Sequence, residues 1–356
     1  MPTPRLAAFV CLLLAAPLGA GCHTPDAPPP VGPDGTPLVS TFSIVAVDTT
    51  TGEIGVAVQS KFPNVRAVVP WVQAGVGAVA TQSFARLDYG RRGLVLMENG
   101  ARADEALAIL LHEDPDPSSR QVGMVDARGR SASWTGAGAF DWRGSLTGET
   151  DAVAIPASGS TGTLVAGRGW AAQGNILVSE ATVQAMADVF EATDGTLAAR
   201  LLAALVAGGA AGGDKRGEQS AALVVHRAGA GYDGSDTVVD ISVYDHPTPL
   251  AELARLYALN DLYFTDSDPG DLIPVTPAIA RELQAIWTAR GFYDGPADGV
   301  VDAEFQRLLA DYMGWENYDL RIDEVTDVDL AAGETLRIDR EVLEDMRAVF
   351  REQRYR

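Results

Sequence analysis

The first residue of this sequence that could do chemistry is Thr41, which opens the β-branched, apolar run TFSIVAV (41–47). A hydroxyl is nearly inert at neutral pH. A Thr or Ser at the N-terminus of a chain can, however, use its own α-amine as the base that activates it. That amine becomes free only if the chain is cut before Ser40 or Thr41. Without such a cut, both are ordinary residues at the start of a strand.

The sequence contains only two lysines, Lys61 and Lys215, beside 25 arginines. Unlike arginine, a lysine can lose its proton when it is desolvated. Lys61 follows a second β-like run in VQSKF, where it could lower the pKa of a Thr41 amine. The alternative is a surface cation at the end of a strand. Lys215 lies in GGDKRGEQSAAL (212–223), which is either a solvated turn or the wall of a pocket that it shares with Asp214, Arg216, Gln219 and Ser220.

Three side-chain amides occupy strand ends or turns. Gln82 ends a β-like run in VATQSF, and Gln173 and Asn175 flank a glycine in AAQGNIL. Amides at such places could donate to an oxyanion or orient an amide substrate. They also stabilise turns without any ligand.

Several other chemistries are excluded by residue type. The two cysteines, Cys11 and Cys22, lie near the N-terminus, so no cysteine further along the chain can be a nucleophile or a metal ligand. The four histidines are widely scattered, at His23, His112, His226 and His246. No P-loop, dinucleotide fingerprint or G-x-S-x-G motif is present. We therefore expect neither a metal nor a cofactor.

The charge balance is strongly acidic. Lys and Arg number 27 against 48 Asp and Glu, a net charge of −21 at pH 7. Residues 260–356 alone hold 22 acidic residues and 10 arginines, a net of −12. A nucleic-acid binder needs a basic footprint, and anionic lipids repel an acidic surface. Nucleic acid is therefore not an expected partner.

The N-terminus has the pattern of an export signal. An apolar run, Leu6 to Leu18, follows Arg5. At ~1.5 Å per residue, this run is too short to cross a hydrocarbon core of ~30 Å. Small residues precede Cys22, so we expect a signal peptide over 1–21 and lipidation at Cys22, followed by a Pro-rich tether over 22–39. The alternative is ordinary cleavage near Ala20. The expected product is an exported protein of the bacterial cell envelope, held at the membrane by its lipid alone.

Hydrophobic periodicity predicts an alternation of strands and helices that favours an α+β fold with antiparallel sheets. Expected strands cover 41–47, 53–60, one or two runs within 65–84, a hairpin over 120–136, and 220–229 and 237–245. Expected helices cover 101–114, 181–193, 196–208 and 250–264. The Gly-, Ser- and Thr-rich residues 144–172 are expected to form a long loop, and the Pro-rich residues 265–277 a linker to a small helical domain over 278–356.

The blocks STFSIVAVDTTTGEIGVAVQSKFPNVRAVVPWVQAGVGAVATQSFARLDYGRRGL, QGN and GGDKRGEQSAALVV resemble the domain of unknown function family numbered 1028 over about 40–258. The resemblance implies a four-layer αββα sandwich, the fold of the N-terminal-nucleophile hydrolases, over 40–264. It also implies that Thr41 or Ser43 lies near the nucleophile position, with Lys61 and the turn from Asp214 to Ser220 beside it. The family's activity is not established. The 150–169 stretch looks inserted relative to the family.

The tail over 280–318 is similar to peptidoglycan-binding-like repeats. The similarity is carried by Leu283, Gln284, Gly291, Tyr293, Asp294, Gly295, Asp298 and Gly299. It implies a helix, a Gly-containing turn and a second helix that bind glycan. Helix-turn-helix packing alone explains the same residues.

These observations lead to two functional hypotheses of different class. The first is a lipid-anchored amide hydrolase of the N-terminal-nucleophile type, acting on peptidoglycan or on a small amide. The alternative is a non-catalytic lipoprotein that binds the cell wall or serves as a scaffold. A small-molecule binder without turnover is a third reading. The sequence leaves open whether the protein is a homo-oligomer.

Overall fold

A computed structural model describes residues 38–39, 41–149 and 161–352, of which 38–39 are described by backbone alone. The expected signal peptide, the lipidation site Cys22 and most of the tether lie outside these residues. So does much of the stretch that looks inserted relative to the family.

The first sheet has the strand order β1-β5-β6-β7-β9, with β4 also paired to β5, and every neighbouring pair is antiparallel. Its strands are β1 (Leu38–Val39), β4 (Pro70–Gln73), β5 (Gly77–Phe84), β6 (Arg120–Asp126), β7 (Arg130–Gly136) and β9 (Gly162–Arg168).

The second sheet has the order β12-β11-β3-β2-β10-β8 and is also antiparallel throughout. Its strands are β2 (Thr41–Asp48), β3 (Glu53–Ser60), β8 (Gly144–Thr147), β10 (Trp170–Gly174), β11 (Ser220–His226) and β12 (Thr237–Val243). The β6–β7 hairpin confirms the hairpin predicted over 120–136, and the strands predicted over 41–47 and 53–60 pair as the β2–β3 hairpin.

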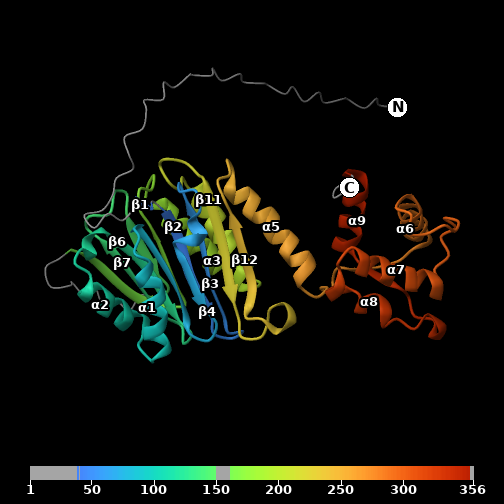
Figure 1. The fold of residues 1–356 in the computed structure, drawn as a ribbon, viewed down its shortest axis with the longest axis horizontal. Coiled ribbons are helices and arrows are strands. Elements are labelled where there is room, and N and C mark those ends of the chain that lie inside the picture. The colour runs from blue at the N-terminus through green and yellow to red at the C-terminus, as the bar shows by residue number, and fades with distance from the viewer. Residues whose placement is uncertain (1–37, 40, 150–160, 353–356) are drawn as a thin grey trace, which may run out of the picture. The chain divides into compact units, whose positions relative to one another are not determined.

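The two sheets face each other, and helices cover their outer faces (Figure 1). Helices α1 (Leu87–Glu98) and α2 (Ala103–Glu113) pack on the first sheet. Helices α3 (Ala181–Ala192), α4 (Leu197–Ala210) and α5 (Pro249–Phe264) pack on the second. The predicted α+β class is confirmed. Short 3-10 helices lie in the connections, at η1 (Val65–Ala67), η2 (Pro117–Ser119), η3 (Tyr232–Gly234), η4 (Asp319–Arg321) and η5 (Leu330–Ala332).

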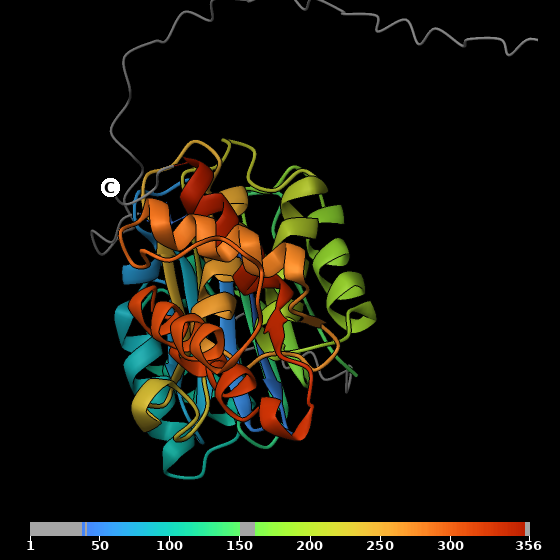
Figure 2. The same ribbon diagram turned by 90° about the vertical axis from the view of Figure 1, so that its right-hand side faces the viewer.

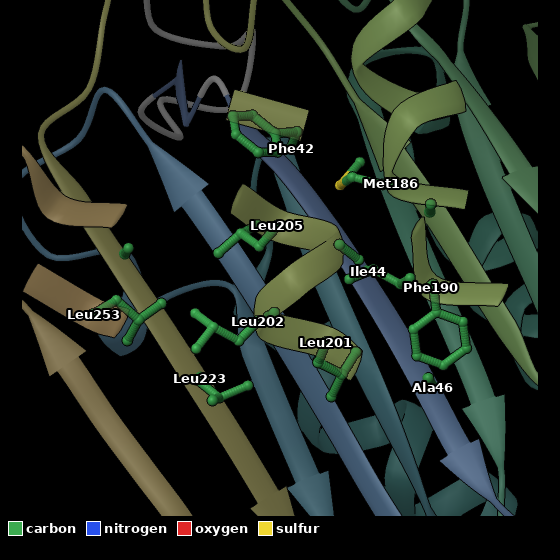
Figure 3. Packing of buried hydrophobic residues seen from close by; sticks show 14 of the residues in the cluster. Phe42, Ile44, Ala46, Met186, Phe190, Leu201, Leu202, Leu205, Leu223 and Leu253 are labelled. Carbon is green, nitrogen blue, oxygen red and sulfur yellow. The ribbon is translucent and has the colours of Figure 1, made fainter. Parts of the chain in front are cut away.

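Alternation along β2 divides its side chains between two environments. Phe42, Ile44 and Ala46 point outward and pack beneath the leucines of α4 (Figure 3). The intervening residues point into the space between the sheets, where Val45 and Val47 join a second apolar cluster. Thr41 and Ser43 share that inward face at the start of the strand, so the space between the sheets is polar at this end.

The C-terminal module has its own hydrophobic core. It comprises α6 (Pro277–Ala289), α7 (Ala303–Trp315), α8 (Asp323–Thr326), α9 (Arg340–Glu352) and a two-stranded sheet of β13 (Leu272–Pro274) and β14 (Arg337–Asp339). Its helices are coloured orange to red in Figures 1 and 2. Helices α6 and α7 match the predicted pair. The segment expected as a linker contains β13, which pairs with β14.

One sequence expectation was wrong, and one helix was not predicted. Residues 144–172 are not one long loop, because they contain β8, β9 and the start of β10. The small residues there allow close approach of neighbouring strands: a Cβ on Gly167 would lie 2.3 Å from the carbonyl oxygen of Gly148. Helix α1 was not expected. Position 90 in this helix requires glycine, because a Cβ there would lie 2.2 Å from the ring of Trp71.

Candidate functional site

Two rows of polar residues meet between the sheets. In the second sheet, Ser43, Gln173 and Ser145 lie side by side in register on β2, β10 and β8. In the first sheet, a matching row on β5, β6 and β7 consists of Gln82, Gln121 and Thr135. We call Ser43, Gln82, Gln121, Thr135, Gln173 and Asn175 the amide network. All six are buried. They come from widely separated parts of the chain, between positions 43 and 175.

Ser43 joins the two rows. Its hydroxyl donates to Oε1 of Gln82 at 2.6 Å and accepts from Nε2 of Gln173 at 2.7 Å. Nε2 of Gln82 then donates to Oε1 of Gln121 at 2.9 Å. The Ser43 hydroxyl is therefore held between two neutral amides, with no base among the side chains bonded to it.

Gln121 is the centre of the network, and the sequence analysis missed it. Its Oε1 accepts from both Gln82 and Nδ2 of Asn175, each at 2.9 Å. Its Nε2 donates to Oγ1 of Thr135 at 3.0 Å and to the carbonyl oxygen of Gly174 at 2.8 Å. The only sequence signal was a long polar side chain directly before the apolar residues of β6.

A glycine makes room for one of the amides. A Cβ on Gly123 would lie 2.2 Å from Oε1 of Gln173, well inside any real contact distance. The same Oε1 accepts from the hydroxyl of Ser133 at 3.3 Å. The absence of a side chain at position 123 thus allows Gln173 to reach across from the opposite sheet.

Thr41 connects the amide network to the end of β3. Its side chain is fully buried, and its hydroxyl donates to Oγ of Ser60 at 3.0 Å. Its carbonyl oxygen accepts from Nε2 of Gln82 at 3.1 Å and from the backbone N–H of Asn175 at 3.0 Å. The chain does not begin at Thr41. Upstream of it, β1 pairs with β5 in the opposite sheet, so the chain passes from one sheet to the other just before Thr41.

The turn beginning at Asp214 lies beside this end of β3. Its carboxylate is buried and accepts from the backbone N–H of Lys61 at 3.3 Å. Arg216 binds the same carboxylate, with Nη2 at 2.9 Å from Oδ2, and also donates to the carbonyl oxygen of Lys61 at 3.3 Å. Ser220, which pairs with Ser60 across the sheet, donates to the carbonyl oxygen of Phe62 at 2.6 Å. The turn is therefore attached to the backbone that follows Ser60.

Three side chains that were predicted to belong to the site point away from the amide network. The Lys61 side chain is exposed, and its ammonium makes no hydrogen bond or ion pair with any residue that the structure describes. Nζ of Lys215 donates to the carbonyl oxygen of Asp141 at 3.0 Å, and Nε2 of Gln219 donates to Asp245 at 2.8 Å. The structure thus brings Thr41, Ser43, Gln82, Gln173 and Asn175 into one connected set. It links Asp214, Arg216 and Ser220 to that set through the backbone around Lys61.

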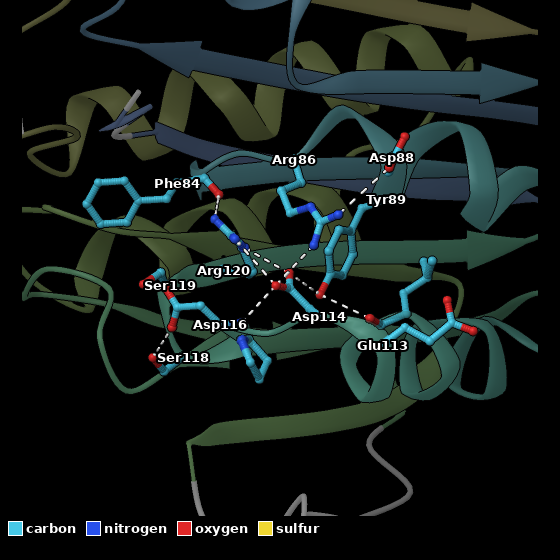
Figure 4. Close-up of polar contacts among 12 residues, drawn as sticks. Phe84, Arg86, Asp88, Tyr89, Glu113, Asp114, Asp116, Ser118, Ser119 and Arg120 are labelled. Carbon is cyan, nitrogen blue, oxygen red and sulfur yellow. Dashed lines mark hydrogen bonds and ion pairs between the residues drawn. The ribbon is translucent and has the colours of Figure 1, made fainter. Parts of the chain in front are cut away.

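A charged cluster lies next to the amide network, because its Arg120 directly precedes Gln121 on β6. Figure 4 shows the polar contacts of this cluster. We call Arg86, Tyr89, Asp114 and Arg120 the Asp114 cluster. Nε of Arg120 donates to the carboxylate of Asp114 at 2.9 Å, and neither side chain is exposed. Nη1 of Arg86 lies 3.1 Å from the same carboxylate, and the Tyr89 hydroxyl donates to it at 3.0 Å.

The pKa values in the Asp114 cluster follow from burial and charge. Burial alone would raise the pKa of Asp114, but hydrogen bonds from Arg120 and from the backbone N–H of Asp116 bring it below its usual value. Burial, together with the neighbouring Asp114 charge, raises the pKa of Tyr89 well above its usual value. The cluster is therefore an ionised Asp held by two arginines and a neutral phenol.

The Asp114 cluster holds the strand ends that carry the amides. Arg120 directly precedes Gln121, and its Nη1 donates to the carbonyl oxygen of Phe84 at 2.8 Å. Phe84 lies two residues beyond Gln82. Between them, Ser83 is buried and has a positive φ of 68°, which is uncommon for a residue other than glycine. The ion pair thus fixes β5 and β6 where the network begins.

A cavity of about 460 Å³ opens beside the amide network. Thr135 and Ser145, one from each row, lie in its wall, and Asp141 and Arg143 contribute charge to it. Among the described residues, no three His, Cys, Asp or Glu side chains gather as metal ligands. In the same part of the chain, no helix is both long and apolar enough to cross a bilayer.

Comparison with protein-family models gives two matches. The model described as "Family of unknown function (DUF1028)" matches residues 41–155 and 156–253. The model described as "Putative peptidoglycan binding domain" matches residues 263–344. Both resemblances stated from the sequence are thereby confirmed. The second match covers the C-terminal module from the end of α5 into α9.

Comparison with solved structures finds the crystal structure of protein SPO2555 from Silicibacter pomeroyi, which carries the same DUF1028 model. The two chains are 28% identical and superpose with a TM-score of 0.51, over 62% of this chain and 89% of that one. Comparison with curated proteins gave no match.

Proposed function

Because this chain belongs to the family of unknown function DUF1028 and carries a peptidoglycan-binding-type module after that domain, we propose that it is a cell-wall-associated protein whose module binds peptidoglycan. The observation that carries this proposal is the match over 263–344, which coincides with a segment that has its own hydrophobic core.

The residues that carry the sequence similarity support the module's fold. Nε2 of Gln284 donates to the carboxylate of Asp298 at 3.0 Å, and Oε1 of Gln284 accepts from the backbone N–H of Gly299 at 2.9 Å. Gly299 has a φ of 79°, which favours glycine. These contacts fix the turn between α6 and α7, so the side chains that recognise a ligand have to be sought elsewhere on the module.

Export and anchoring complete this proposal. We propose that residues 1–21 are removed and that Cys22 is lipidated, because a short apolar run and small residues precede that cysteine. Intact-mass analysis of the protein from the native membrane fraction tests this. We expect a mature chain that begins at a diacylglyceryl-modified Cys22. A C22A variant should be released from the membrane. A wild-type chain beginning near Gly21, without lipid, would contradict the anchor.

Co-sedimentation with purified sacculi tests the wall-binding function. The full mature chain should be enriched in the pellet, and an unrelated protein of similar negative charge should stay in the supernatant. Equal recovery of the two proteins would overturn the proposal. The chain is acidic, so attraction to a positively charged polymer is not expected to drive binding. Recovery should therefore be the same at low and at moderate ionic strength.

Amide hydrolysis is a second candidate function, and the placement of Thr41 favours it. In an N-terminal-nucleophile mechanism, a chain freed before Thr41 would use its α-amine to take the proton from Oγ1. That oxygen would attack the carbonyl carbon of an amide, the C–N bond would break, and the leaving amine would receive the proton. Water would then hydrolyse the ester to Thr41. The support is that Thr41 opens β2 beside the amide network, where its hydroxyl donates a hydrogen bond to Ser60 in the uncut chain.

Two measurements test the hydrolase. The first is mass spectrometry of the native protein, in which a chain beginning at Thr41 is expected. The second compares amide hydrolysis by a protein released at Thr41 through an engineered protease site with the same protein carrying T41A. A native chain that always extends upstream of Thr41 would contradict the amine-base mechanism, as would equal activity of the two released proteins.

A further inference from the structure

Among the described residues of the C-terminal module, Trp315 is the most exposed of the large apolar side chains. Trp315, the last residue of α7, is 73% exposed. Its ring lies against Phe292 in an edge-to-face contact, with 6.1 Å between ring centroids. Phe292 in turn lies edge-on to the buried Tyr312, at 5.2 Å. We call Trp315 and Phe292 the aromatic platform. It rests on the core of the module and is not on a loose loop.

Polar groups border the platform. Arg290 and Glu316 flank it in sequence, and Nη2 of Arg290 lies 3.9 Å from Oε1 of Glu316. Both side chains are mostly covered, being 18% and 20% exposed. Nε of Arg290 is buried and has no acceptor among the residues that the structure describes. A buried donor without an acceptor is costly. Because Nε is buried, the part of Arg290 that a ligand can reach is the remainder of its guanidinium group.

This combination of surfaces matches the two sides of a sugar. A pyranose ring has an apolar face of C–H groups and a rim of hydroxyl and amide groups. Tryptophan offers a broad apolar face, and the partly exposed Arg290–Glu316 pair, close in sequence to the platform, offers a donor and an acceptor. An anionic lipid is disfavoured because residues 260–356 carry a net charge of −12.

We propose that the aromatic platform is the glycan-binding surface of the module. An N-acetylated amino sugar of the peptidoglycan strand stacks on Trp315. Its amide or hydroxyl groups bond to Arg290 and Glu316. This inference rests on the proposed wall-binding function and specifies the part of the wall polymer that is recognised.

Binding of the full mature chain and its variants to purified sacculi, and to a soluble tetramer of N-acetylglucosamine, tests the platform. W315A should weaken both interactions about tenfold or more, as expected for loss of an aromatic anchor. W315F should retain part of the affinity because it keeps an aromatic face. The matched control is V300A, which removes a side chain that is 51% exposed in the same module and should bind as wild type.

The outcomes separate this inference from the function on which it rests. If the wild-type chain sediments with sacculi and W315A does so equally well, the platform is not the site and the proposed function stands. If W315A and V300A weaken binding alike, the effect is not specific to Trp315 and the inference fails. If the wild-type chain does not bind sacculi, both proposals fail. Circular dichroism of each variant shows whether its fold is intact.

Discussion

The amide network and the Asp114 cluster are neighbours in the same body and are built from opposite chemistry. In the network, neutral amides and hydroxyls bond to one another across two sheets. In the cluster, an ionised carboxylate is held by two guanidinium groups. A neutral hydrogen bond contributes about 1 kcal/mol net, whereas stranding a buried charge costs several kcal/mol. The comparison indicates that the cluster is the stronger anchor of the two.

The largest effect is expected from Arg120→Met. This change leaves the Asp114 carboxylate buried with less compensation, because only the partly exposed Arg86 remains to neutralise it. The free energy of unfolding should fall by about 3–5 kcal/mol. Urea denaturation followed by circular dichroism measures it. A loss below about 1 kcal/mol would show that the cluster is not the anchor described here.

A smaller effect is expected from Gln121→Leu. The change removes the Oε1 that accepts from Gln82 and Asn175, and it removes the side-chain amide that donates to the carbonyl oxygen of Gly174. Unfolding should become easier by about 2–3 kcal/mol, because each stranded group costs about 1–3 kcal/mol and neighbouring amides can re-pair. The control is Gln184→Leu on the exposed face of α3, which should change stability by less than about 0.5 kcal/mol. Equal effects of the two changes would contradict a cooperative network.

Gly123→Ala should cost about 1–3 kcal/mol, because the new Cβ would overlap the Gln173 amide. Adding Gln173→Ala should recover part of that loss, since it removes the overlapping group. The coupling energy from this double-mutant cycle, again measured in urea, should therefore be favourable. Additive losses would mean that Gly123 does not serve to make room for Gln173.

The smallest expected effect is a change in folding stability at low pH. The pKa of Asp114 is lowered in the folded state, so its ionised form contributes stability above the unfolded-state value of about 4. That contribution is lost as the pH falls through the folded-state pKa. The amide network has no titratable group and should not add to this loss.

Urea midpoints of wild type and D114N at pH 7, 4 and 3 test the acid prediction. D114N should be less stable than wild type at pH 7 but lose less stability between pH 4 and pH 3. Parallel losses in the two proteins would assign acid sensitivity to other carboxylates.

Local pattern was sufficient for most elements of the fold. Alternating apolar residues correctly located the β2–β3 and β6–β7 hairpins, because each has a tight turn and a buried face. It failed for α1 and for residues 144–172, where glycines break the expected pattern. In both places the glycine is explained by a distant neighbour, such as Trp71 over Gly90. That information is not local to the sequence.

The candidate site divides in the same way. Gln82, Gln173 and Asn175 were singled out because amides at strand ends are chemically useful, and they do bond within one network. Gln121 was missed because its importance comes from its register opposite Gln82 and Thr135. Lys61 was singled out as a rare amine. Its backbone joins the site, while its side chain points to solvent.

The sequence by itself determined the chemistry open to this protein. Residue types exclude a thiol nucleophile beyond Cys22, the charge balance disfavours nucleic acid, and a hydroxyl stands at the head of β2. Only the tertiary structure decided that one row of polar residues from each sheet faces the other row. It also decided that β1, just upstream of Thr41, pairs with β5 in the opposite sheet. The physical reason is that strand register and sheet packing depend on contacts between residues far apart in the chain, which no local pattern records.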